Sequence, residues 1–121
     1  MTECSIHAGH CTIEDHCGVR ANWRRINDVV ADALRGAEAM VHLVAIPRET
    51  GGRRFDETNV RGTGRVVIAA EHAGVRRIVH LSVLGVSDDP RLAYLHSKWR
   101  GEQLVRESSL EWVVLRPSLL F

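Results

Sequence analysis

The stretch Gly74-Val75-Arg76-Arg77-Ile78-Val79-His80-Leu81-Ser82 decides the predicted fold of this chain. Gly74 lies where a preceding helix would end, because glycine adopts the left-handed conformation of a helix C-terminus without strain. Residues 78–81 form a short, mostly apolar run, which is typical of a strand buried on both faces of a parallel sheet. The stretch therefore predicts a helix that stops, turns and leads into a buried strand.

Similar helix-strand units flank this stretch on both sides. Upstream, helical periodicity from residue 26, with Asn27 or Asp28 as the cap and Gly36 as the stop, leads to an apolar run at 39–45. The periodicity predicts a second helix over 55–73 and a third over 94–107, the last leading to a strand over 112–115. Alternating helices and apolar strands predict an α/β fold with a three-stranded parallel sheet and right-handed crossovers.

Composition narrows the functional classes. The chain has 121 residues, which fits one modest domain, and 16 basic against 15 acidic residues, so no charge excess points to nucleic acid. No apolar run approaches the ~18 residues of a membrane span, and the N-terminus lacks the pattern of a signal peptide. We therefore expect a cytoplasmic protein whose three cysteines are reduced thiols.

Residues 1–24 differ from the rest, because they lack apolar periodicity and are rich in potential metal ligands: Cys4, His7, His10, Cys11, His16 and Cys17. Closely spaced cysteine and histidine can build a zinc site, but this spacing matches no standard zinc pattern. We predict no metal site and an irregular, poorly ordered leader. The folded domain is then expected to span residues 25–121.

Tyr94 and Lys98 are the only tyrosine and the only lysine in the chain. Four residues apart on a helix, they share one face. An ammonium beside a phenol favours the phenolate, which would suit Tyr94 to acid-base work near neutral pH. The alternative is that both side chains simply lie on the surface of a helix.

Five segments in order resemble the short-chain dehydrogenase/reductase superfamily in its extended and atypical branches. They are Val41-His42-Leu43-Val44-Ala45, Asn59-Val60-Arg61-Gly62-Thr63, the stretch from Ala73 to Ser82, Tyr94 to Lys98 with Gly101-Glu102, and Leu115-Arg116-Pro117-Ser118. The resemblance covers about residues 26–121 and is strongest to NAD(P)-binding epimerase-like proteins and to the nucleotide-binding accessory subunit of respiratory complex I. It implies a partial Rossmann-like, doubly wound parallel sheet.

The resemblance also implies the site. Tyr94 would be the proton donor or acceptor, Lys98 would bind the nicotinamide ribose and lower the pKa of Tyr94, and Ser82 would be the third catalytic candidate. The implied cofactor is NAD or NADP, and the residues implied to bind it are Leu43, Val44, Ala45, Asn59, Ser82, Tyr94, Lys98, Pro117 and Ser118. The expected partners are this nucleotide and an unknown small-molecule substrate.

Two departures from the family limit the expected activity. Residues 1–25 contain no Gly-rich turn of the kind that holds a pyrophosphate at a helix N-terminus. Val83 stands where catalytic members place a serine or threonine, and valine cannot hydrogen-bond a substrate oxygen. We expect weak turnover and weak NAD(P) affinity.

Three functions remain open at this point. The chain could be an NAD(P)-binding epimerase-, dehydratase- or reductase-like protein, a non-catalytic nucleotide-binding or assembly protein, or a truncated, inactive gene product. Without a first Gly-rich strand, the strand at 41–44 becomes an edge, and one face of the sheet is poorly covered. Exposed apolar edges pair with other chains, so we also expect aggregation or dimerisation.

Overall fold

The computed structural model describes residues 20–118, in which helices alternate with strands. The elements are α1 (Arg20–Leu34), β1 (Ala39–His42), the π-helical segment η2 (Asp56–Gly62), α2 (Thr63–His72), β2 (Arg77–Leu81), α3 (Ala93–Arg106) and β3 (Glu111–Leu115). The three strands form one parallel sheet in the order β1-β2-β3. The α/β prediction, with a three-stranded parallel sheet, is confirmed.

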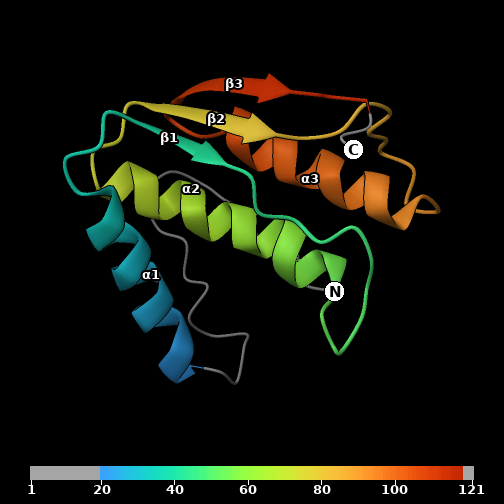
Figure 1. Cartoon of the computed structure of the whole chain (residues 1–121), viewed down its shortest axis with the longest axis horizontal. Helices are drawn as coiled ribbons and strands as arrows, with labels where there is room; N and C mark the ends of the chain where they lie inside the picture. The colour runs from blue at the N-terminus through green and yellow to red at the C-terminus, as the bar shows by residue number, and fades with distance from the viewer. Residues whose placement is uncertain (1–19, 119–121) are drawn as a thin grey trace.

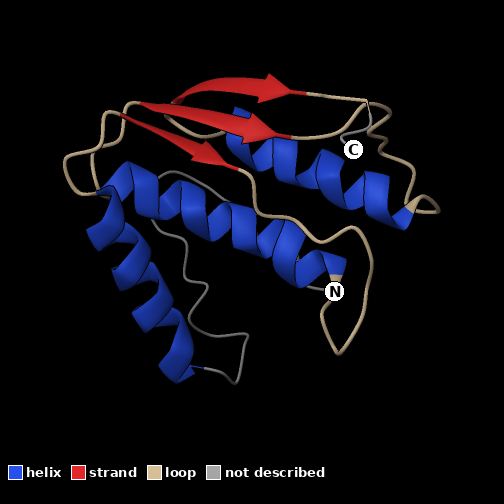
Figure 2. Ribbon diagram, viewed as in Figure 1, coloured by secondary structure: helices blue, strands red, loops and turns tan. Residues whose placement is uncertain are grey.

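All helices lie on one side of the sheet. Figures 1 and 2 show α2 and α3 against the same face, with α1 packed beyond α2. Between this face and the helices lies a core of six buried apolar residues: Val67, Ala70, Val75, Ile78, Val105 and Leu110. Ile78 and Val105 are fully buried, so β2 and α3 anchor this core.

The opposite face of the sheet has no cover among residues 20–118 (Figure 2). Side chains alternate along a strand, and the parallel register aligns those that point the same way. The apolar side chains that point away from the helices form what we call the bare face: Val41, Val79, Leu81, Val113 and Leu115. Arg77 and Glu111 point the same way at its amino end and form a 2.8 Å ion pair. Because Val41 is 63% exposed and Val113 is 42% exposed, the prediction of strands buried on both faces is wrong. The expectation of one poorly covered face is confirmed.

The first helix begins earlier than predicted. It starts at Arg20, so Asn27 and Asp28 lie inside it and do not cap it. The reason is that residues 20–34 contain no glycine or proline, and nothing interrupts the backbone hydrogen bonds of the helix. The Cys- and His-rich segment 4–17 lies outside the described residues.

The second helix has the predicted extent, but its first part is π-helical. Thr63 donates its hydroxyl hydrogen bond to the carbonyl of Asn59, 2.8 Å away, at the point where η2 becomes α2. π-helical turns are rare and often mark functional sites. Within the described part of the chain, no helix is both long and apolar enough to cross a membrane.

Candidate functional site

Tyr94 lies in the first turn of α3 and is half-buried. Its ring packs against Phe55, with 5.8 Å between ring centroids and an interplanar angle of 52°. Within residues 20–118 the hydroxyl of Tyr94 has no hydrogen-bond partner, so it is available to a ligand. The structure does not bring it into hydrogen-bond contact with Lys98 or Ser82.

Lys98 lies one turn after Tyr94 and is only 4% exposed. Its ammonium donates a 2.8 Å hydrogen bond to the backbone carbonyl of Leu81, the last residue of β2. Burial lowers the pKa of Lys98, and the carboxylate of Glu102 opposes that effect. The sole lysine therefore lies at the carboxyl end of the central strand, where ligand sites in open α/β sheets are found.

Ser82 follows β2 directly and is also buried. Its N–H donates a 2.7 Å hydrogen bond to the carbonyl of Leu115, and Leu84 donates to the carbonyl of Pro117. These bonds carry the pairing of β2 and β3 past the strand ends and bring Ser82 near Pro117. The hydroxyl of Ser82 makes no hydrogen bond of ordinary geometry among the described residues, although it lies near enough to the carboxylate of Glu102 to help lower the pKa of that group. A buried hydroxyl that lacks such a bond is costly unless a ligand or water satisfies it.

The other predicted residues lie at the same end of the sheet. Leu43 and Val44 follow β1 and are 60% and 64% exposed, while Ala45 is half-buried. Ser118 follows Pro117 and is exposed. The structure thus gathers the predicted residues of the three strands at their carboxyl ends, and their contact with a cofactor stays a prediction.

Asn59 differs from the others, because its side chain is 2% exposed and is used within the protein. Its carboxamide accepts a hydrogen bond from the N–H of Ile46 and donates to the carbonyl of Ile46 and to the hydroxyl of Ser97. Ser97 donates in turn to the carbonyl of Tyr94. Asn59 therefore joins the loop after β1 to the helix that carries Tyr94 and Lys98.

The sequence analysis missed a buried imidazole pair, His42 and His80. Their rings stack with centroids 5.3 Å apart, and His42 shares a 3.1 Å hydrogen bond with the hydroxyl of Thr63. Burial, followed by the charge of Lys98, lowers the pKa of each imidazole to about 4. Both nitrogens of His80 lack partners among the described residues. The two histidines lie opposite each other on adjacent strands, in a register that the sequence alone does not fix.

A second missed feature is the ion pair between Glu102 and Arg116. The guanidinium of Arg116 donates two hydrogen bonds, of 2.9 and 2.7 Å, to the fully buried carboxylate of Glu102. Glu102 also pairs with Arg106, one turn later on α3, at 3.5 Å. Burial would raise the pKa of Glu102, but the hydrogen bonds from Arg116 hold it below its ordinary value. The bond to Arg116 fixes the end of β3 to α3.

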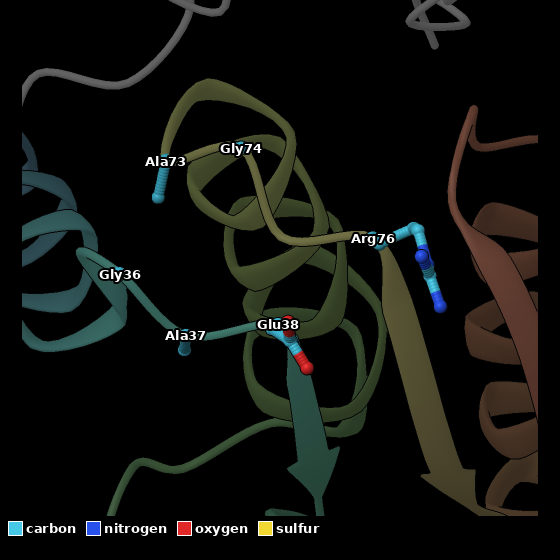
Figure 3. Close-up of a pocket in the computed structure, with 6 residues that line it drawn as sticks. All are labelled: Gly36, Ala37, Glu38, Ala73, Gly74 and Arg76. Carbon is cyan, nitrogen blue, oxygen red and sulfur yellow. The ribbon is translucent and has the colours of Figure 1, made fainter.

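The opposite end of the sheet carries a shallow hollow. Figure 3 shows its lining, the two helix-to-strand turns around Gly36 and Gly74, which lie side by side. None of the predicted site residues lines it. The candidate catalytic and cofactor-binding residues thus lie at the other end of the strands. In residues 20–118, no group of histidine, cysteine, aspartate or glutamate is placed to hold a metal ion.

Comparison with known proteins identifies the class. The family model described as NAD(P)H-binding matches residues 18–121. The chain therefore belongs to the NAD(P)H-binding family of atypical short-chain dehydrogenases/reductases.

Two relatives of the chain carry names that describe different proteins, a subunit of NADH dehydrogenase and a reductase. The chain is 30% identical over 97 residues to mouse NADH dehydrogenase [ubiquinone] 1 alpha subcomplex subunit 9, covering 80% of this chain and 26% of the relative. It is 35% identical over 86 residues to a (4-alkanoyl-5-oxo-2,5-dihydrofuran-3-yl)methyl phosphate reductase of Streptomyces griseus, covering 70% of this chain and 27% of that enzyme. The chain thus spans about a quarter of the length of these relatives.

Solved structures give the same fold. A Bacillus halodurans protein described as an NAD-dependent epimerase/dehydratase superposes with a TM-score of 0.66 at 24% identity, over 75% of this chain and 45% of that one. A short-chain dehydrogenase/reductase superfamily protein of Agrobacterium tumefaciens, solved with bound NAD, gives a TM-score of 0.58 at 34% identity, over 74% of this chain and 34% of that one. The partial Rossmann-like fold is thereby confirmed.

The described residues suit one end of a dinucleotide better than the other. Lys98 and the hydroxyls of Ser82 and Tyr94 are groups that can hold a ribose and a nicotinamide. The helix that follows the β1 loop has Asp56 and Glu57 in its first turn, which repel a pyrophosphate at that helix end. These donors would suit a nicotinamide-ribose unit, and residues 20–118 contain no Gly-rich phosphate cradle.

Proposed function

We propose that this chain binds the nicotinamide-ribose end of NAD or NADP at the carboxyl ends of β1, β2 and β3, as an epimerase-, dehydratase- or reductase-like protein. The observation that carries the proposal is the position of Lys98, whose ammonium is fixed to the carbonyl of Leu81 at the end of the central strand. The hydroxyl of Ser82, which is buried at the same strand end, supports it. Family membership supports the choice of ligand.

Each residue then has a defined role. Lys98 donates hydrogen bonds to the ribose hydroxyls. Tyr94 gives a proton to a substrate oxygen, or takes one from it. Leu43, Val44 and Ala45, with Pro117 and Ser118, form the walls of the site. A bound nicotinamide would supply the hydride acceptor or donor.

Calorimetric titration of the full chain with NAD and NADP tests the proposal. We expect weak binding, which Lys98→Met reduces at least tenfold, since methionine keeps the volume of the stem and removes the charge and donors. The matched control is Arg100→Met on the same helix, which removes a cation in an exposed ion pair with Asp56. Equal binding by the wild-type chain and by Lys98→Met would contradict the proposal.

Turnover should be low because Val83 provides no hydroxyl for a substrate carbonyl. Loss of one such donor typically costs on the order of 10²–10³ in rate. We expect Val83→Thr, made in a full-length homologue that has valine here, to raise the rate by a similar factor. Robust activity that does not change on this substitution would indicate that Ser82 or another group already orients the substrate.

A second candidate function is a non-catalytic, nucleotide-binding assembly protein that associates with a second copy of itself. The bare face and the edge strand β1 favour this function, because Val41 and Val44 are 63% and 64% exposed and this edge contains no lysine or proline. Light scattering should detect dimers or larger species, and Val41→Lys should shift them to monomers, whereas Leu84→Lys in an exposed loop should not. A monodisperse wild-type monomer would exclude this association.

The cellular compartment belongs to the same proposal. We place the chain in the cytoplasm, whereas the mouse relative is named as mitochondrial. Fractionation of cells that express the tagged chain distinguishes the two compartments. Recovery of the chain with mitochondria would overturn the cytoplasmic placement.

A further inference from the structure

One side of α3 carries a stripe of functional groups that the proposed site uses only in part. Tyr94, Lys98, Glu102 and Arg106 follow one another at intervals of four residues, which places them on one face of the helix. Tyr94 and Lys98 belong to the proposed site, while Glu102 is fully buried and has no assigned role. A fully buried carboxylate is rare unless it is paired, and here it is paired with Arg116.

Of the ionisable side chains in residues 20–118 that act on Lys98, only one is negatively charged near pH 7. The groups that face it are the imidazoles of His42 on β1 and His80 on β2, both neutral near pH 7, and the carboxylate of Glu102 on α3. The cations Arg106 on α3 and Arg116 after β3 both contact Glu102. Glu102 therefore supplies the negative charge that acts on Lys98, and it does so through space, one helical turn away.

We propose that Glu102 is a positioning residue that keeps Lys98 charged in its buried place, and that Arg116 limits the strength of this effect by pairing with Glu102. The inference rests on the proposed function, in which Lys98 acts as a cation. The ion pair between Glu102 and Arg116 then does more than hold β3 against α3, because it also sets how strongly Lys98 stays charged. The two partners of one ion pair then have opposite effects on Lys98.

The sole lysine makes this inference directly measurable. A chain labelled with [ε-¹³C]lysine gives one lysine resonance, and its pH titration reports the ionisation of Lys98 alone. Glu102→Gln should lower the pKa of Lys98, raising its acid dissociation constant about tenfold, as expected for the loss of one charge a helical turn away. Arg116→Gln should raise the pKa of Lys98, because the charge of Glu102 is then less compensated. Glu107→Gln, at an exposed position on the same helix end, should leave it unchanged.

Opposite directions separate this role from simple loss of structure, which would move Lys98 toward ordinary solvent behaviour in both variants. Glu102→Asp keeps the charge and should restore the wild-type titration if Glu102→Gln folds poorly. Shifts in the same direction for Glu102→Gln and Arg116→Gln, or no shift in Glu102→Gln, would overturn the inference. The titration uses no nucleotide, so it remains informative even if NAD(P) binding is absent and the proposed function fails.

Discussion

Toward the carboxyl ends of its strands, the two faces of the sheet reverse the usual distribution of polar and apolar side chains. On the helix-covered face, β1 and β2 bury the imidazoles of His42 and His80, at 4% and 1% exposure. On the bare face, the neighbouring positions carry Val41 and Val113, which are 63% and 42% exposed. A sheet with one solvated face ordinarily shows the opposite alternation, apolar inside and polar outside. The buried imidazoles thus lie where the charge of Lys98 acts on both, whereas the bare face exposes apolar side chains.

The covered face should therefore make the fold sensitive to acid. Each imidazole has its pKa lowered from 6.5 to about 4, chiefly by burial, so the unfolded chain binds protons more tightly than the folded one. The contribution of the neutral imidazoles to the free energy of unfolding is fully present above pH 6.5 and is lost as the pH falls to about 4. The expected loss is about 3 kcal/mol for each imidazole.

Urea unfolding at a series of pH values measures this loss. His80→Leu should flatten the dependence between pH 6.5 and 4, whereas substitution of the exposed His72 by alanine should not. A stability curve of the wild-type chain that stays flat over this interval would mean that the imidazoles are already protonated or hydrated in the folded state.

The apolar residues of the two faces should also differ in their contribution to stability. Ile78→Ala on the covered face removes a fully buried side chain, and we expect a loss of about 2–5 kcal/mol in the free energy of unfolding. Val113→Ala on the bare face should cost less than about 1 kcal/mol in the monomer. Equal losses in urea unfolding at low protein concentration would show that the bare face is covered in solution.

A smaller effect is expected where α3 meets η2. A side chain at Gly101 would place its Cβ 2.8 Å from the carbonyl oxygen of Asn59, so Gly101→Ala must move the helix that carries Tyr94 and Lys98. Overpacking of this kind costs about 1–3 kcal/mol. The control is Gly64→Ala, whose Cβ meets only the mobile end of Leu104 at 3.4 Å and which gains helix propensity. A Gly101→Ala chain as stable as wild type would contradict the close approach.

Much of this architecture follows from the sequence, because apolar periodicity and glycine stops mark element boundaries. The alternation of helices and strands and the extents of the second and third helices were predictable for that reason. The start of α1 was not, because Asn27 and Asp28 can cap a helix but do not prevent one from continuing through them. The uncovered face was inferred from the missing Gly-rich strand, whereas local pattern alone predicted strands buried on both faces.

The residues of the candidate site were predictable from the sequence, but the contacts between their side chains were not. Tyr94, Lys98 and Ser82 stand out by residue type and motif spacing. The pairing of Glu102 with Arg116 joins two segments across a turn and a strand, and spacing along a helix cannot reveal it. For the same reason the stacking of His42 on His80 becomes visible only when the register of β1 and β2 is known.

We propose that the covered face ends in a site for the nicotinamide-ribose half of a dinucleotide, with no phosphate cradle among the described residues. Saturation-transfer difference NMR with NADH on the full chain tests it most directly, because this method works for weak binding and identifies the ligand protons that touch the protein. We predict strong signals from the nicotinamide and its ribose, weak signals from the adenine, and loss of the nicotinamide signals in Lys98→Met. Signals concentrated on the adenine, or no signal at millimolar NADH, would contradict the account.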